Sequence, residues 1–400
     1  MKLLYKTAHF TDQSIKKMSG VLEEYIAFLQ DVARKNSYNQ PESFINVPFD
    51  EKQINQVFTV NNLTVNQHLK YVLVLGIGGS SLGAKAIYDA IQGHYLLLQP
   101  EHFPKVFFMD TIDPDFRKHL EVLLKREAQT PEEVLITVVS ESGTTLETRN
   151  NLEFLMQTSP HYKERVVILT NVDSPLWKED CENPDKCLVV PRKVGGRYSV
   201  FTPVGMFPLS VVGVNILGLV EGAMEARKDG ILPGVEENKA LLSAVVSYMA
   251  YERGLTTQVS FVFNPKLESV GKWWCQLLAE SLGKDGKGVT PLISVGTNDL
   301  HSMLQLYIDG PRDKLFNFIS CESEMSREVR AVLSGVKKSF DEHKIPYTET
   351  ILDRIDEHSL GYFMQTKMME VIMLGKLMGI NPFGQSAVED YKKYARELLA

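Results

Sequence analysis

Two stretches of the sequence decide the fold: residues 71–81, YVLVLGIGGSS, and residues 134–145, VLITVVSESGTT. Each joins an apolar, β-branched run to a loop of glycine and hydroxylated residues. Where a strand gives way to a helix, such a loop offers unpaired backbone N–H groups and the positive end of the helix dipole, and both favour an anion. The sequence therefore predicts an α/β fold whose strand ends bind a phosphorylated small molecule.

Strand-like and helical patterns alternate along the chain, which indicates parallel sheets covered by helices. Strand candidates lie at 71–75, 105–110, 134–140, 165–170 and 187–191 and, after a break near residue 230, at 259–264, 290–295, 314–321 and 347–352. A chain of 400 residues exceeds what one core usually serves, so two α/β domains are expected. We divide it into an N-terminal helical segment (1–50, with helices at 11–35), a first domain (51–228), a second domain (229–380) and a C-terminal helical segment (381–400, with the helix from about 387 to 399).

The composition excludes several function classes. A net charge of −7 argues against nonspecific binding to nucleic acid. No run approaches the ~18 apolar residues that a membrane span needs, and the first ten residues are too short and polar for a signal sequence, so we expect a soluble protein without a membrane partner.

The cysteines and histidines indicate neither a metal nor a redox site. Four cysteines lack CxxC spacing and are too few for a disulfide framework, which favours a reducing cytoplasm. None of the nine histidines shows HxH or HExxH spacing, so no metal site is expected.

The first loop departs from the known nucleotide-binding patterns. Gly76 and Gly78 match the dinucleotide fingerprint, but Ser81 occupies its third glycine position. A nucleoside triphosphate loop would need a lysine where this chain has Ala84. We therefore expect no nucleotide cofactor.

The second loop combines hydroxyl groups with one carboxylate. The hydroxyls of Ser140, Ser142 and Thr145 can satisfy phosphate oxygens without a lysine. Glu141 opposes this, since a carboxylate repels a dianion. Glu147, in the first turn of the following helix, either complements the helix dipole or contacts the sugar, and we keep it as a candidate sugar-binding residue.

Acid–base and electrostatic candidates stand in four further motifs. Arg197 follows two glycines and suits a phosphate or an enolate oxygen, although an isolated arginine is more often a surface ion pair. Gln276 and Glu280 share a helix face, where burial would raise the pKa of Glu280; a solvated helix carboxylate is the alternative.

His301 offers an acid–base group. The spacing of Gln385 and Lys392 predicts one helix face, a pattern that a terminal helix with surface lysines also shows.

Together these motifs resemble the glucose-6-phosphate isomerase family, in particular its shorter bacterial members, along nearly the whole chain. GIGGSSLG, SESGTTLET, VGGRYS, QLLAESLGK, GTNDLH and FGQSAVEDYK occur in the family's order and spacing. The resemblance implies two sugar-isomerase (SIS) domains, each a three-layer α/β/α sandwich, in a homodimer. It also implies a phosphorylated hexose substrate and the reversible isomerisation of glucose 6-phosphate and fructose 6-phosphate, in glycolysis and gluconeogenesis, with neither cofactor nor metal.

Roles follow from the resemblance residue by residue. Ser80, Ser140, Ser142 and Thr145 match phosphate ligands, and Gly79, Gly196, Gln276 and Gln385 match sugar contacts. Arg197 matches the residue that stabilises the enediolate, and Glu280 matches the base that moves a proton between C2 and C1. Lys392 and the partner subunit's His301 match the pair that opens the ring.

The chain departs from the family pattern at three places. Glu141 stands where the family usually has Lys, Gly384 replaces Asp, and Ser386 with Ala387 replaces Pro and Gly. None of these changes removes a proton-transfer residue, so we expect weaker phosphate binding with the chemistry intact. Two alternatives remain: a related SIS phosphosugar isomerase acting on or also accepting mannose phosphate, and a noncatalytic phosphosugar sensor.

Overall fold

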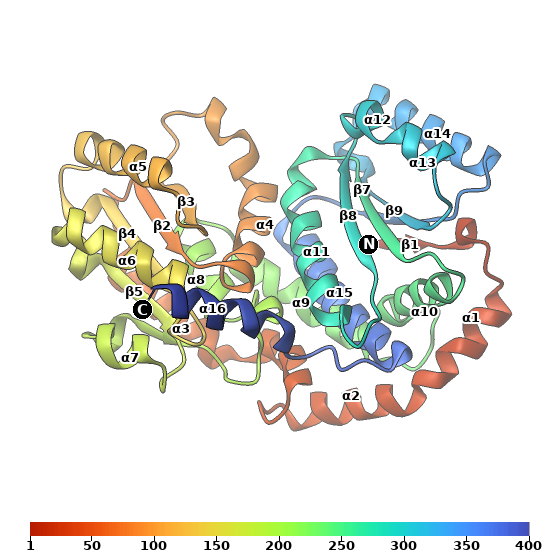
Figure 1. Cartoon of the computed structure of the whole chain (residues 1–400), viewed down its shortest axis with the longest axis horizontal. Coiled ribbons are helices and arrows are strands. Elements are labelled where there is room, and N and C mark those ends of the chain that lie inside the picture. Colours follow the sequence, from red (N-terminus) through yellow and green to blue (C-terminus); the bar gives the residue numbers. More distant parts are fainter. Residues whose placement is uncertain (400) are drawn as a thin grey trace.

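The computed structural model describes residues 1–399 and contains two sheets with helices on both faces (Figure 1). The first sheet has the order β3-β2-β4-β5-β6, and all its neighbouring strands are parallel. Its strands are β2 (Tyr71–Leu75), β3 (Lys105–Met109), β4 (Val134–Val139), β5 (Val166–Thr170) and β6 (Cys187–Val189). Every residue of β2 and β4 is buried, as expected for apolar runs covered on both faces.

The side chains of β2 alternate between two cores. Val72 and Val74 enter a core shared with α3, α4 and α8, whereas Leu73 and Leu75 enter one shared with α5 and α6. The helices of this half are α3 (Glu51–Thr64), α4 (Leu82–Ile91), α5 (Pro114–Glu127), α6 (Leu146–Thr158), α7 (Pro175–Asp180) and α8 (Pro203–Val211). This arrangement confirms the predicted α/β/α sandwich.

The second sheet has the order β1-β10-β9-β7-β8. Its strands are β1 (Lys2–Leu4), β7 (Thr257–Val262), β8 (Thr290–Val295), β9 (Lys314–Cys321) and β10 (Tyr347–Leu352). An aromatic core with Phe316 and Phe318 packs one face against α13 (Leu304–Asp309) and α14 (Arg327–Glu342). The other face shares a core with α10 (Lys239–Glu252), α11 (Glu268–Leu282) and α15 (Glu357–Met378).

The sequence missed β1, which pairs antiparallel with β10 at the sheet edge. A three-residue strand is too short to show alternation, and its partner lies more than 340 residues away. The helices expected at 11–35 are present as α1 (Asp12–Ser19) and α2 (Glu23–Lys35).

Helix α9 (Ile216–Gly230) stands between the two sheets in the sequence and packs along α15. The core that contains Val72 and Val74 therefore continues from the first sheet to the second. The predicted boundaries at 50, 228 and 380 stay predictions. None of the helices within residues 1–399 is long and apolar enough to cross a membrane, and the cytoplasmic location expected from the sequence also stays a prediction.

The C-terminal segment crosses from the second half of the molecule to the first. After α15, the chain runs without regular structure through residues 379–385 and forms a short turn of helix (Ser386–Val388) and α16 (Glu389–Leu399). Figure 1 shows α16, in dark blue, on the side of the first sheet. This crossing lets residues from the end of the chain reach the loops after β2 and β4.

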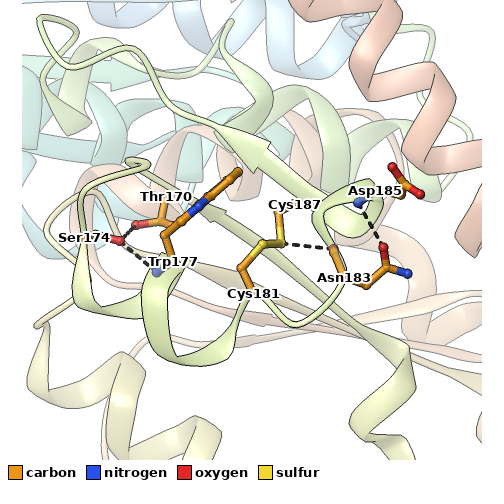
Figure 2. Close-up of a disulfide and its surroundings, with 7 residues drawn as sticks. All are labelled: Thr170, Ser174, Trp177, Cys181, Asn183, Asp185 and Cys187. Carbon is orange, nitrogen blue, oxygen red and sulfur yellow. Dashed lines mark hydrogen bonds between the residues drawn. A yellow bond between two sulfur atoms is a disulfide. The ribbon is translucent and has the colours of Figure 1, made fainter.

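Two of the four cysteines form a disulfide, which the sequence analysis did not predict. Cys181, just after α7, is bonded to Cys187, the first residue of β6 (Figure 2). A short helical turn, Pro184–Lys186, folds the chain back so that the two Cα atoms lie 6.3 Å apart. The sequence spacing alone did not show this turn-back, and the cysteine pattern no longer supports a reducing compartment.

Candidate active site

A cavity of about 840 Å³ opens where the loops after β2 and β4 meet α11 and the C-terminal segment. Most of the site residues predicted from the sequence line it, although they come from stretches more than 300 residues apart. The lining residues among them are Gly79, Ser80, Ser142, Thr145, Glu147, Gly196, Arg197, Gln276, Glu280, Gln385 and Lys392.

The loop after β2 lies backbone to backbone against the loop that carries Arg197. A Cβ atom at Gly79 would come within 2.2 Å of the carbonyl carbon of Gly196 and 2.5 Å of the Arg197 nitrogen. Only glycine fits at position 79, because any side chain would force the two loops apart. This contact therefore fixes Ser80 and Arg197 on the same cavity wall.

Ser140 shapes the loop after β4 from beneath the cavity. Its side chain is buried, its Oγ accepts a hydrogen bond from the Gly143 N–H at 3.1 Å, and it lies 2.9 Å from Thr145 Oγ1. Gly143 has a φ of +70°, and a Cβ there would lie 2.8 Å from the Leu176 nitrogen, so this position also requires glycine. The loop presents Ser142 and Thr145 to the cavity, whereas Ser140 is not on its surface.

The charges beside this loop are of both signs. Glu141 is exposed to solvent, yet it sits in the concave wall of the cavity, where lost hydration raises the pKa of its carboxyl. Arg192 also lines the cavity; its Nε donates to Asn171 Oδ1 at 3.2 Å, and its guanidinium pairs with Asp173. The cavity lining thus carries a guanidinium as well as the Glu141 carboxyl.

Helix α11 presents Gln276 and Glu280 together, as the spacing predicted. Gln276 Nε2 donates to Glu280 Oε1 at 3.0 Å, and Arg197 Nη1 donates to Glu280 Oε2 at 3.3 Å. The Glu280 side chain keeps 32% of its surface exposed, so the enclosure expected from its apolar sequence neighbours is incomplete. Each carboxylate oxygen of Glu280 thus accepts a hydrogen bond, and the carboxylate lines the cavity.

Arg197 is nearly completely buried, and all five of its N–H donors have acceptors. Besides Glu280, Nε donates to Ser281 Oγ at 2.9 Å and Nη1 to Gln385 Oε1 at 3.1 Å. Nη2 donates to the carbonyl oxygens of Pro382 and Gly384, at 2.8 and 3.0 Å. Arg197 is therefore not an isolated surface arginine: it joins the loop after β6, helix α11 and the C-terminal segment.

The expectation that Gln385 and Lys392 share a helix face is wrong. Gln385 precedes the helical turn Ser386–Val388 and has a non-helical backbone, whereas Lys392 belongs to α16. Both still line the cavity, because the turn between them carries the chain along its wall. Lys392 Nζ donates to Glu389 Oε1 at 2.7 Å, one turn earlier in α16.

His301 is not among the lining residues of the cavity. It is exposed on α12 (Asp299–Ser302), beyond the second sheet. Within one chain, the structure thus does not bring His301 to Glu280. Residues 1–399 contain no group of three or more His, Cys, Asp or Glu side chains placed to hold a metal ion.

The sequence patterns gave no role to Arg192, Ser281 or Lys284. Ser281 accepts from Arg197, and Lys284 donates to the carbonyl oxygens of Asn381 and Phe383, both at 2.7 Å. Ser281 and Lys284 belong to the QLLAESLGK motif, and Lys284 stands four residues after Glu280. That spacing was the available signal, but the acceptors lie about 100 residues away.

Comparison with known proteins bears directly on this arrangement. The family model described as phosphoglucose isomerase matches residues 60–331, about two thirds of the chain. The chain belongs to the phosphoglucose isomerase family. The matched residues include both hydroxyl-bearing loops, Arg197, Glu280 and His301.

Relatives of the phosphoglucose isomerase family match most of the chain. Glucose-6-phosphate isomerase of Methanocaldococcus jannaschii is 34% identical over 82% of this chain and 84% of its own. Glucose-6-phosphate isomerase of Rubrobacter xylanophilus is 30% identical over 89% of both chains. These relatives cover both halves of the molecule.

Solved structures confirm the fold. A hypothetical protein of Thermus thermophilus superposes with a TM-score of 0.88 at 24% identity and covers 100% of this chain and 99% of its own. A glucose-6-phosphate isomerase of Chlamydia trachomatis gives 0.81 at 21% identity, covering 99% and 88%. A tagatose-6-phosphate ketose/aldose isomerase of Escherichia coli gives 0.53 at 15% identity, covering 88% and 95%. The chain therefore shares its α/β fold with these solved structures.

Proposed function

We propose that this aldose–ketose isomerase interconverts glucose 6-phosphate and fructose 6-phosphate, with Glu280 as the group that moves the proton. The observation that carries the proposal is the position of Glu280. Its carboxylate stands between Gln276 and Arg197 on the wall of a cavity that also contains both hydroxyl-bearing loops. A proton acceptor, a fixed cation and a phosphate cradle thus share one site.

The phosphate end of the substrate lies at the loops after β2 and β4. Ser80, Ser142 and Thr145 offer hydroxyl groups there, together with backbone N–H groups at the starts of α4 and α6. Ser140 supports this loop rather than contacting the phosphate. Glu141 adds negative charge to the cavity lining, and Arg192 adds positive charge there for a dianion, although its guanidinium also pairs with Asp173.

The sugar end lies at Glu280, between Gln276 and Gln385. The carboxylate takes the proton from C2 of the open-chain aldose, and the electron pair of that C–H bond forms the double bond of an enediolate. The hydroxyl proton of O2 passes to O1. Glu280 then returns its proton to C1, and an electron pair of O2 forms the carbonyl group of the ketose as the C1–C2 double bond is lost. Arg197 places a permanent positive charge beside the developing oxyanion, where electrostatic stabilisation contributes most.

Opening of the pyranose ring needs an acid and a base at the ring oxygen and the anomeric hydroxyl. Lys392 lines the cavity and supplies one of them. His301 lies outside this cavity, so we propose that His301 of the partner subunit of a homodimer supplies the other. The exposed position of His301 on α12 is compatible with contact to a second copy.

The test is direct conversion of fructose 6-phosphate by the purified protein, coupled to detection of glucose 6-phosphate. Glu280→Gln removes the proton acceptor but keeps the shape, so kcat falls by about 10²- to 10⁴-fold while substrate still binds. Glu268→Gln is the matched control, since Glu268 is the first residue of the same helix and pairs with Lys272 at the surface. Full activity in Glu280→Gln would remove Glu280 from this role.

A further inference from the structure

We propose that Lys284 is a positioning residue of the active site, which fixes the backbone of residues 381–384 so that Arg197 and Gln385 keep their places beside Glu280. This inference rests on the isomerase function proposed above. It concerns a lysine that does not line the cavity and that no step of the mechanism uses.

Two cations hold four consecutive carbonyl groups in alternation. Lys284 Nζ donates to the carbonyl oxygens of Asn381 and Phe383, each at 2.7 Å. Arg197 Nη2 donates to those of Pro382 and Gly384, at 2.8 and 3.0 Å. Residues 381–384 form neither helix nor strand, so these bonds replace the regular backbone pairing that would otherwise fix the segment.

The clamped segment leads directly to a cavity residue. Gln385 follows Gly384 and accepts from Arg197 Nη1 at 3.1 Å, and the same Nη1 donates to Glu280. Gly384 has a φ of +71°, which glycine adopts without strain and which turns its carbonyl oxygen toward Arg197. A shift of this backbone therefore moves Gln385 and leaves donors of Arg197 unpaired.

A purely local role does not account for Lys284. Basic residues after a helix often interact with the last carbonyl groups of that helix. Lys284 follows α11 by two residues, but both acceptors of its Nζ belong to the C-terminal segment, about 100 residues away. The lysine therefore joins α11, which carries Glu280, to the segment that carries Gln385.

The charge of Lys284 is sensitive to mildly alkaline pH. Lost hydration and the positive charge of Arg197 lower its pKa to about 8, against the opposing effect of Asp285 and Glu280. The clamped residues 381–384 carry no charged side chain, and Lys287 in the same loop donates elsewhere, to the Met378 carbonyl. As pH rises through the folded-state pKa, the ammonium loses its charge and its bonds to the two carbonyl oxygens weaken.

The first experiment compares Lys284→Met with Lys287→Met. Lys287 lies in the same loop and also donates to a carbonyl oxygen, at 2.9 Å. Its acceptor is Met378, at the end of α15, which precedes residues 381–384. In Lys284→Met we expect kcat to fall by about tenfold to 100-fold, the range that a displacement of about 1 Å produces. KM changes less, because the phosphate loops are untouched. Lys287→Met stays within about twofold of wild type, as a change at a site away from the cavity should.

Hydrogen exchange of peptides covering 379–388 provides a readout that does not depend on activity. The proposal expects faster exchange there in Lys284→Met, with unchanged exchange in β2 and β4. A fall in kcat without faster exchange in this segment contradicts a positioning role, and so does faster exchange with unchanged kcat. If the wild-type protein itself fails to isomerise fructose 6-phosphate, the proposed function fails instead, while the exchange result still reports on the clamp.

Lys284→Arg tests the charge and covers the case in which Lys284→Met does not fold. Arginine keeps two donors and a charge that does not titrate in this range. At pH 7.5 we expect near wild-type kcat. Above pH 8 the wild type loses activity as Lys284 deprotonates, whereas Lys284→Arg keeps its activity. The alkaline limb of the pH–activity profile therefore lies at higher pH in Lys284→Arg. An alkaline limb that is identical in both proteins overturns the proposal.

Discussion

Arg197 and Glu280 lie 3.3 Å apart, Nη1 to Oε2, although 83 residues separate them in the sequence. The guanidinium is buried and completely hydrogen-bonded, whereas the carboxylate is partly exposed to the cavity. The proposed cation is thus held rigidly, and the proposed proton carrier is accessible. Such a fixed charge stabilises a developing oxyanion without having to reorganise during the reaction.

Reversing the charge at Glu141 will strengthen substrate binding. Glu141→Lys replaces a carboxylate on the cavity wall with an ammonium group, so KM for fructose 6-phosphate falls while kcat stays close to wild type. Glu141→Gln removes the repulsion without adding attraction and should give an intermediate KM. Steady-state kinetics at constant ionic strength measure both variants; an unchanged KM in Glu141→Lys would mean that residue 141 does not affect the phosphate.

Removing the charge of Arg192 will weaken binding. Arg192→Gln takes the guanidinium from the wall beside Asn171, and we expect KM to rise about threefold, since an exposed charge pair contributes about 0.2–1 kcal/mol. Lys193→Gln is the control, because Lys193 is exposed and does not line the cavity. The effect of Arg192→Gln should shrink at high salt, where exposed charges are screened. Equal effects of the two variants would indicate only a general loss of charge.

Mixing two inactive variants will restore activity if His301 acts across a dimer. A hybrid of Glu280→Gln with His301→Ala contains one site with both native residues and one site with neither. After joint unfolding and refolding, we expect about one quarter of the wild-type activity, since about half of the dimers are hybrids with one intact site each. Each variant refolded alone is the control. A mixture no more active than its components would place His301 and Glu280 of the same chain in one site, or His301 outside the chemistry.

Breaking the buried ion pair of α15 will destabilise the fold. Lys367 Nζ lies 2.8 Å from Glu370 Oε2, their side chains are 6% and 1% exposed, and the ammonium also lies 4.6 Å from the Trp274 ring centre. Glu370→Gln leaves this ammonium without a counter-charge, so the free energy of unfolding falls by about 3–5 kcal/mol. Glu121→Gln breaks the exposed pair with Lys125 and should cost no more than about 1 kcal/mol. Urea denaturation at one protein concentration compares them.

The strands and the hydroxyl-bearing loops were predictable because their signals are local. An apolar run such as residues 71–75 indicates a strand that is covered on both faces, and the glycines after it mark where the chain turns. The shared face of Gln276 and Glu280 likewise follows from helix geometry, and their hydrogen bond confirms it. By contrast, strand β1 and the Cys181–Cys187 bond depend on how separate parts of the chain come together, and the local sequence pattern does not predict these contacts.

By itself, the sequence determined which residue types stand at each strand end and helix face, because burial and backbone periodicity are properties of a few neighbouring residues. Only the tertiary structure decided which of those positions meet. It placed Gly79 against Gly196, carried Gln385 and Lys392 along the cavity wall, and left His301 outside it. The physical reason is that such contacts depend on the packing of whole helices and sheets. Lys284 shows this most clearly, since its two acceptors lie about 100 residues away in the sequence and come within reach only when the C-terminal segment packs beside the end of α11.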